Sequence, residues 1–228
     1  MAIRVVLIDE NIFKSLLLAS ALENDGINVA DTSNSFADVE KFMKKHKPDA
    51  LIFSLDTHAI QAIIASEKAR HINSDLGLVF LTNVPDIRLL GLRTKELPRG
   101  AQVIVRESVT QLHDLATAIK RSIQDLDVIE TANKSMDSSS YTESTFALAL
   151  QSLTAVQIET LRLVAMGNSN AEIARVRLVT EKAVEHTITR MLQALKIAAN
   201  PRHNARILLS REYFRFVEVD NQSPKLVS

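Results

Sequence analysis

The stretch that most constrains the fold of this chain is residues 153–197, which carries three helical patterns in quick succession. Thr154 and Gln157 have the spacing of a capping box, in which two side chains satisfy backbone N–H groups at a helix start. Gly167 and Asn168 then predict the end of this helix, because both residues tolerate the left-handed backbone found at a helix C-cap.

A second and a third helix follow with equally short connections. Ser169 and Glu172 have the spacing of another capping box, and Thr180 is an N-cap residue after a predicted turn at 176–179. The third helix has apolar residues at helical spacing, namely Val184, Ile188, Met191, Leu192 and Leu195. The pattern predicts a helix-turn-helix, whose last helix has the size to enter the major groove of DNA.

This segment resembles the DNA-binding domain of the LuxR/NarL family of transcriptional regulators. The resemblance covers about a quarter of the chain. The matching residues are Leu153, Thr154, Gly167, Ser169, Asn170, Glu172, Ile173, Ala174, Thr180, Lys182, Val184 and Leu195. The resemblance implies binding to double-stranded DNA and a fourth helix, here beginning at Asn200-Pro201 and running through Ile207 to Tyr213, that supports dimerisation. We expect a homodimer, because a module this small and weakly charged needs two half-sites for useful affinity.

The outward face of the third helix holds the candidate DNA contacts, which are Lys182, Glu185, His186, Thr189, Arg190 and Gln193. Arg190 has the donors to reach a guanine edge or a phosphate, Thr189 and Gln193 suit bases, and Lys182 suits a phosphate. Several outward positions depart from the family: Ala183, Glu185, Thr187 and Ala194. The alternative interpretation of this face is an ordinary solvated helix surface.

Charge is distributed unevenly along a chain whose formal net charge is zero. Residues 1–145 hold 16 Lys/Arg against 20 Asp/Glu, whereas residues 151–228 hold 11 against 7. The C-terminal part is therefore the one suited to a polyanion. The absence of cysteine, of a signal-like N-terminus and of any long apolar run leads us to expect a cytoplasmic protein without disulfides.

The N-terminal part predicts an α/β domain. Short apolar runs alternate with helical patterns, as in a parallel sheet covered on both faces. The predicted strands are 3–8, a weaker edge strand at 27–30, 50–55, 78–82 and 102–105. Functional groups of such sheets gather at the carboxyl ends of the strands. Here those ends carry Asp9, Glu10, Ser54, Asp56, Thr82 and Arg106.

This set resembles the active site of a response-regulator receiver domain, and the resemblance covers residues 3–125. Receivers have an acidic pair for Mg²⁺, matched by Asp9 and Glu10, and a Thr or Ser matched by Thr82. Their phosphoacceptor aspartate is replaced by Ser54, and their lysine after the fifth strand by Arg106. The receiver is therefore expected to be five-stranded, flavodoxin-like and atypical.

These replacements change the expected chemistry. An unactivated serine hydroxyl is a poor nucleophile, so we expect no aspartyl-type phosphorylation at Ser54. Asp56 is the alternative acceptor, because strand side chains two apart point the same way. Asp9 and Glu10 are weak candidates for Mg²⁺; the alternative is a salt bridge to Arg106, a fixed fork of donors. No other cofactor or catalytic site is expected.

The sequence suggests boundaries at residues 1–125 for the receiver, 126–147 for a helix extension and flexible linker, 148–214 for the helix-turn-helix domain, and 215–228 for a tail. Leu112, Ile119 and Leu126 are seven apart, which fits either the last receiver helix or a short coiled coil. The segment 131–145 is rich in Ser and Thr, which is typical of a linker.

Together these features predict a DNA-binding transcriptional regulator of the two-component type that acts without aspartyl phosphorylation, as a homodimer. A regulatory protein or small ligand at the receiver pocket would be its input. The alternative is an interaction protein whose helix-turn-helix no longer reads DNA. A third interpretation is a receiver that accepts phosphate on Asp56.

Overall fold

The computed structural model describes residues 2–109, 111–124, 130–131, 150, 152–197 and 204–217. They divide into two compact units. The first holds the described residues up to Thr131 other than Val84–Gly91, and the second holds Val84–Gly91 together with the described residues from Leu150 onward.

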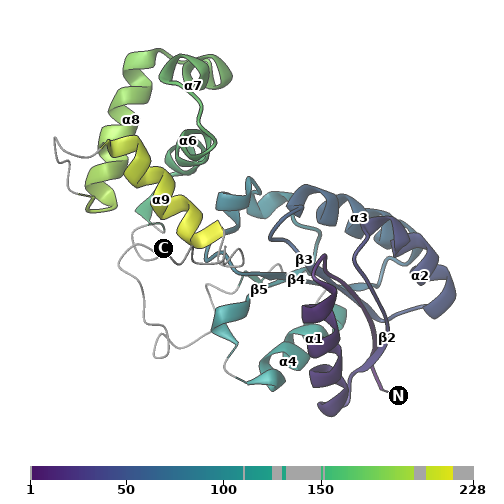
Figure 1. Ribbon diagram of the computed structural model, residues 1–228. Helices are drawn as coiled ribbons and strands as arrows, with labels where there is room; N and C mark the ends of the chain where they lie inside the picture. Colours follow the sequence, from purple (N-terminus) through teal and green to yellow (C-terminus); the bar gives the residue numbers. More distant parts are fainter. Residues whose placement is uncertain are drawn as a thin grey trace, which may run out of the picture. The chain divides into compact units, whose positions relative to one another are not determined.

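The first unit is built on a parallel sheet (Figure 1). Its strands are β1 (Arg4–Ile8), β2 (Asn28–Ser33), β3 (Ala50–Ser54), β4 (Gly77–Thr82), β5 (Gln102–Val105) and β6 (Glu130–Thr131), in the order β2-β1-β3-β4-β5-β6. The expected five strands are confirmed, including β2 at the edge. The two-residue strand β6 pairs with β5 and was missed, because it lies where the sequence predicts a linker.

Among the residues that the structure describes, α-helices cover both faces of this sheet. They are α1 (Ile12–Asn24), α2 (Val39–His46), α3 (Ala59–Ile72) and α4 (Leu112–Gln124). Figure 1 shows α1 and α4 on one face and α2 and α3 on the other. Leu22 of α1 and Ile119 of α4 are buried against Leu7 and Ile52 of the strands. On the other face, the ring of Phe53 stacks between those of Phe36 and Phe80.

The connection between β4 and β5 corrects one expectation. Helical segments were expected to alternate with all strands, but this connection contains two 3₁₀ turns, η2 (Ile87–Leu90) and η3 (Thr94–Glu96). Pro85, Gly91 and Pro98 interrupt the segment, and residues of these types break or end α-helices. A further 3₁₀ turn, η4 (Arg106–Ser108), follows β5, and η1 (Phe36–Asp38) precedes α2.

The second unit contains the predicted helix-turn-helix. Its helices are α6 (Ala155–Ala165), α7 (Asn170–Arg177), α8 (Glu181–Ala194) and α9 (Ala205–Val217). The Thr154–Gln157 capping box is confirmed, as are the N-caps Ser169 and Thr180. Glu172 does not complete a second capping box, because its carboxylate instead bonds Arg175 of the next turn at 3.2 Å.

The segment Val84–Gly91 packs into the core of this second unit. Leu89 is fully buried in the same cluster as Leu161 of α6 and Leu209 of α9. The Arg88 guanidinium donates to the Leu153 carbonyl at 2.9 Å. Burial raises the pKa of Tyr213 on α9, so its hydroxyl stays protonated and donates to the Leu89 carbonyl at 3.0 Å.

Several expectations fall on residues outside the described ranges. They include the helix extension at 126–129, nearly all of the linker, the start of the fourth helix at Asn200-Pro201 and the tail from 218. Helix α9 continues to Val217, three residues beyond the expected end of the domain at 214, and so contains the predicted Ile207–Tyr213 helix. Across the described part of the chain, no helix has the length and apolar character needed to cross a membrane.

Gly77 at the start of β4 offers a test of this packing. A Cβ there would lie 2.6 Å from Ser122 Oγ and 2.7 Å from Ile123 Cγ1 of α4. Gly77→Ala should therefore lower the free energy of unfolding by about 1–3 kcal/mol, since overpacking outweighs the entropy gain of alanine. Calorimetric melting of the full chain measures it. A variant that is as stable as wild type would contradict this packing of α4 on the sheet.

Candidate functional site

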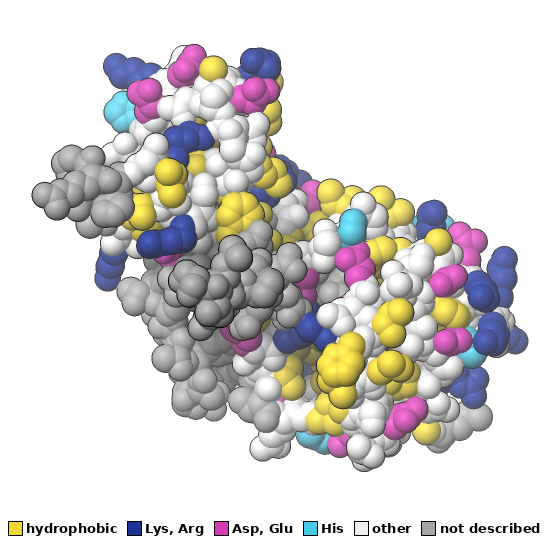
Figure 2. Space-filling model, viewed as in Figure 1, with side chains coloured by type: hydrophobic (Ala, Val, Ile, Leu, Met, Phe, Trp, Pro, Cys, Tyr) yellow, Lys and Arg dark blue, Asp and Glu magenta, His cyan; other side chains and the backbone are white. Residues whose placement is uncertain are grey.

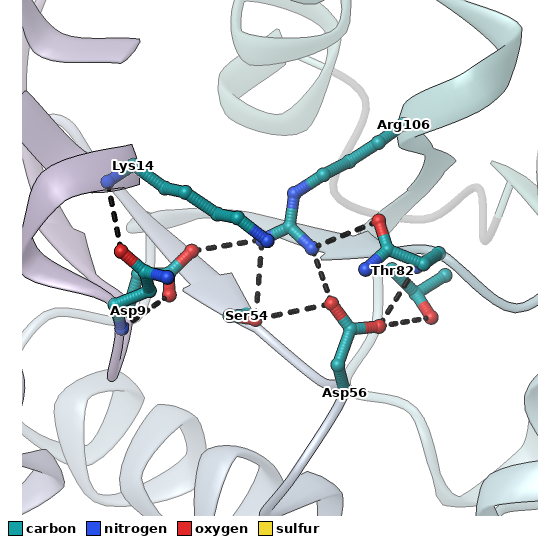
Figure 3. A network of polar contacts seen from close by, with 8 residues as sticks. Asp9, Lys14, Ser54, Asp56, Thr82 and Arg106 are labelled. Atoms are coloured by element: carbon teal, nitrogen blue, oxygen red, sulfur yellow. Dashed lines mark hydrogen bonds and ion pairs between the residues drawn. The ribbon is translucent and has the colours of Figure 1, made fainter. Parts of the chain in front are cut away.

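The carboxyl edge of the sheet brings five predicted side chains together (Figure 3). The strands end level with one another, since Ile8 pairs with Phe53, and Ser54 with Leu81. Asp9 follows β1, Ser54 ends β3, Asp56 lies two residues later, Thr82 ends β4 and Arg106 follows β5. Residues far apart in sequence thus form one polar cluster, which we call the Arg106 network.

Arg106 joins the two carboxylates of this network. Its Nη2 donates to Asp9 Oδ2 at 2.8 Å and to Ser54 Oγ at 3.1 Å. Its Nη1 donates to Asp56 Oδ2. The three charged side chains are largely buried, with 23% of Arg106, 15% of Asp9 and 17% of Asp56 exposed. The guanidinium is therefore a fixed bridge between β1 and the loop after β3, as its fork of donors allows.

Both oxygens of Asp56 are occupied by donors. Oδ1 accepts from the Thr82 hydroxyl at 3.0 Å and from the Asn83 backbone N–H at 2.7 Å. Oδ2 accepts from Arg106 and, at 3.5 Å, from the Ser54 hydroxyl. Asp56 thus does point into the pocket, as the two-residue spacing predicted. Its carboxylate ties the ends of β3, β4 and β5 together and presents no oxygen free of a donor.

The Ser54 hydroxyl is poorly placed to act as a nucleophile. Its oxygen accepts a hydrogen bond from a cationic guanidinium, which withdraws electron density from the lone pairs that would attack phosphorus. The nearest base is Asp56 at 3.5 Å, a carboxylate already bound by three other donors. The absence of a phosphoryl group at position 54 stays a prediction.

Glu10 does not join the network. Its carboxylate bonds Nδ1 of His58, which precedes α3, and both side chains are partly exposed. The expected acidic pair is therefore split, with Asp9 turned inward and Glu10 turned toward His58. No sequence pattern pointed to His58, or to Asn83 and Asn11, whose backbone N–H groups donate to Asp56 and Asp9.

The donor set does not suit the Mg²⁺ ion that the receiver resemblance implies. Arg106 occupies the oxygen of Asp9 that faces the pocket, and His58 occupies Glu10. A guanidinium in contact with both Asp9 and Asp56 also repels a divalent cation placed between them. Within the described residues, no group of three or more His, Asp or Glu side chains is arranged to hold a metal.

The second candidate site is the outward face of α8. All six predicted contacts, Lys182, Glu185, His186, Thr189, Arg190 and Gln193, are exposed, while Val184, Ile188 and Met191 are buried. Thr189 donates its hydroxyl to the Glu185 carbonyl at 3.0 Å, which leaves its oxygen facing outward as an acceptor. Neither Arg190 nor Lys182 forms an ion pair with another described residue, so both charges are available to contact a ligand.

The turn before α8 exposes a leucine that sequence reasoning overlooked. Leu178 is the C-cap of α7, with a left-handed φ of 53°, and 91% of its surface is exposed. Leucine rarely adopts this conformation, and an apolar side chain so exposed gains nothing from the core. Glycine is the residue usually found at a left-handed helix C-cap, so a leucine at this position is unusual.

Comparison with known proteins finds solved structures with a similar fold. No family model matches the chain, and no curated protein matches it. Among solved structures, RcsB in a structure of two dimers bound to two parallel DNAs has a TM-score of 0.54 at 16% identity, covering 95% of this chain and 100% of that one. The response regulator RcsB in a complex with DNA has a TM-score of 0.52 at 16% identity, with the same coverages.

A third similar structure is RcsB from Salmonella enterica serovar Typhimurium bound to the promoter P1flhDC with a phosphomimetic. It has a TM-score of 0.51 at 16% identity and covers 95% of this chain and all of its own. The similarity thus spans both units, and the expected class, a receiver-like parallel sheet followed by helices, is confirmed as a fold.

Removal of the Arg106 side chain tests whether it neutralises Asp9 and Asp56. Arg106→Ala leaves Asp9 and Asp56 facing each other, and should lower the free energy of unfolding by about 2–4 kcal/mol. Millimolar Mg²⁺ should then stabilise the variant more than wild type, because the freed carboxylates can bind it. Thermal melting with and without Mg²⁺ measures both effects. Lys44→Ala, which removes an exposed cation of α2, is the control, and an equal Mg²⁺ response in all three proteins would refute the idea.

Proposed function

We propose that this chain is a DNA-binding transcriptional regulator of the two-component type that acts without aspartyl phosphorylation and works as a dimer in the cytoplasm. The observation that carries the proposal is the exposed face of α8. It belongs to a capped helix-turn-helix whose other face is buried. The six outward side chains include a guanidinium, an ammonium, an amide and a hydroxyl, which are the groups that contact phosphates and base edges.

Structural similarity supports the DNA and dimer parts of the proposal. One RcsB structure that shares this fold along its whole length is described as two dimers bound to two parallel DNAs, and two others are described as RcsB bound to DNA or to a promoter. A single helix-turn-helix buries little surface, and dimers gain affinity by contacting two half-sites about one helical turn apart. We therefore expect a roughly palindromic operator.

The Arg106 network supports independence from phosphorylation. A receiver is switched when a phosphoryl group brings negative charge to this edge of the sheet. Here Ser54 replaces the acceptor, and Arg106 already holds Asp9 and Asp56 in a closed set of bonds. The unit is thus held in one state by its own side chains. Control would come from a protein or small ligand.

One observation favours a second candidate, an interaction protein that does not read DNA. Within α8, Glu181 and Glu185 offset Lys182 and Arg190, so these charges sum to zero on the helix that would meet phosphates. Such a helix has little electrostatic attraction for DNA in general. Under this alternative, selection from random DNA would enrich no sequence.

The first experiment is selection of binding sites from a random DNA library with the purified full chain and no phosphodonor. We expect one enriched motif. On that motif, Arg190→Ala should weaken binding about 10–100-fold, and Lys182→Ala should reduce the salt slope by about one counterion. Fluorescence anisotropy over a salt series measures both. Lys120→Ala, an exposed cation of the first unit, should leave affinity unchanged.

Acetyl phosphate with Mg²⁺ tests the phosphorylation part separately. We expect no change in DNA affinity and no covalent label on wild type. A label that Asp56→Asn abolishes would replace this proposal with the receiver that uses Asp56. An absent motif would instead favour the interaction protein.

Leu178 provides a second test of DNA contact. Leu178→Gly should raise the free energy of unfolding by about 0.5–1 kcal/mol, because glycine adopts the left-handed conformation without the cost that leucine bears. The same variant should bind the selected DNA several-fold more weakly, since an exposed leucine before α8 suits a thymine methyl group.

Melting temperature and anisotropy measure these two effects. Lys47→Gly is the matched control, since Lys47 also has a positive φ, of 46°, but lies in the first unit. It should gain stability without any change in DNA binding. A Leu178→Gly variant that binds DNA as well as wild type would show that the strained leucine serves another purpose.

A further inference from the structure

The first unit has a cleft of about 540 Å³ at the amino edge of its sheet, which we call the amino-edge cleft. Its lining comes from the starts of β1 and β2, the loop between α2 and β3, and the end of α4. Because β1 is five residues long, the cleft and the Arg106 network lie roughly 17 Å apart along it. Ligand pockets of proteins measure roughly 300–1,000 Å³, so this cleft has the size for a small molecule.

Part of the lining is apolar. Ile3 and Ile123 face the cleft, and both pack against the core of the first unit while they remain partly exposed. Asn28 and Gln124 add side-chain amides. Apolar walls with a few polar groups are typical of small-molecule sites, because the walls exclude water and the polar groups orient the ligand.

The charges at the cleft are mostly positive. Arg4, Lys47 and Lys120 line it together with one carboxylate, that of Asp49, which leaves a net charge of +2. Asp49 serves the backbone, since its Oδ2 accepts from the Arg4 N–H at 2.7 Å and its own N–H donates to the Arg4 carbonyl at 2.8 Å. Figure 2 shows further Lys and Arg side chains over the neighbouring helix α2. The field at the cleft therefore favours an anion.

The cationic groups keep donors for a ligand. Arg4 Nη1 donates to the carbonyl of His46, the last residue of α2, at 3.0 Å, which holds the guanidinium at the cleft. Neither Lys47 nor Lys120 makes a side-chain hydrogen bond or ion pair with another described residue. Both ammonium groups can thus contact an anion without first breaking a contact within the described part of the chain.

The backbone at Lys47 is unfavourable for a lysine. Lys47 is the C-cap of α2 and has the left-handed conformation, with φ 46° and ψ 58°. Glycine adopts this conformation without steric cost and is the residue usually found at such a cap. The dipole of α2 does not explain a further cation, because Lys44 and Lys45 already lie in its last turn. The ammonium at the cleft is the feature that a lysine adds here.

We propose that the amino-edge cleft binds a small organic phosphate, whose phosphate group contacts Lys47 and Lys120 and whose apolar body lies against Ile3 and Ile123. A phosphate monoester carries a charge of about −1.5 to −2 at pH 7, which complements the net charge of the cleft. A single carboxylate would leave about half of that charge without a partner. The inference goes beyond the proposed function and does not depend on DNA recognition.

Calorimetric titration of the full chain with three probes is the first test. Phenyl phosphate carries the charged group and an apolar ring, inorganic phosphate the charged group alone, and benzyl alcohol the ring without the charge. We expect phenyl phosphate to bind with a dissociation constant below about 1 mM and at least about 5-fold more tightly than either of the others. No binding of phenyl phosphate up to about 10 mM, or binding no tighter than that of inorganic phosphate, would overturn the proposal.

Charge-removing variants test the two lysines. Lys47→Gln and Lys120→Gln replace exposed side chains and should each weaken phenyl phosphate binding about 3–10-fold, because each removes one charge-assisted contact. Lys44→Gln is the matched control, since Lys44 is an exposed cation of α2 outside the cleft; it should change the affinity less than about twofold. Equal losses in all three variants would indicate a diffuse field and overturn the site.

Lysine acetylation locates the site in the unsubstituted chain. With phenyl phosphate at about three times its dissociation constant, Lys47 and Lys120 should react about fourfold more slowly with N-hydroxysuccinimidyl acetate, because about three quarters of the sites are occupied. Lys44 and Lys182, of the second unit, should react as fast as without the probe. Peptide mass spectrometry measures the rates, and protection of Lys182 in place of the two cleft lysines would overturn the proposal.

Discussion

The contact of one guanidinium with two carboxylates determines the chemistry at the edge of the sheet. In a receiver of the usual kind, acidic groups at this edge are balanced by a lysine and a divalent cation. Here Arg106 reaches Asp9 and Asp56 at once, and Ser54 adds no charge. Ser54 and Arg106 therefore belong together. Two carboxylates already outnumber the one guanidinium, so a third at position 54 would add a further uncompensated negative charge. The planar fork of arginine also fixes its two partners in a geometry that the point charge of a lysine does not impose.

The same network has a mechanical consequence. Asp56 binds groups from the ends of β3, β4 and β5, and Arg106 extends the link to Asp9 after β1. Partly buried charges of this kind are costly to separate, because each would be left without a partner in a region of low dielectric. This edge of the sheet is thus held by the chain's own side chains. Under the proposed function, regulation through this unit would require a partner or ligand that competes with Arg106.

The fold was predictable where local chemistry decides it. Caps at Thr154, Ser169 and Thr180 and the apolar runs of the strands fixed elements to within a few residues, because both signals are local. The 3₁₀ turns between β4 and β5 were not predictable, since Pro85 and Pro98 allow turns of many kinds. In the site, Asp56 was found from strand alternation, but His58 and Asn83 were not, because their partners depend on how loops meet across strands. Exposure of Leu178 is likewise a tertiary property.

The weak net charge of α8 constrains how the proposed DNA contact could gain affinity. Under the proposed function, α8 would draw little affinity from counterion release, because Glu181 and Glu185 cancel the charges of Lys182 and Arg190. Affinity must then come from direct contacts, repeated in two linked copies, where the second contact is made at a high effective concentration. The dimer of the proposed function would supply that linkage without adding positive charge. A protein built this way would bind DNA with less dependence on salt than a strongly basic regulator, and with more dependence on its own concentration.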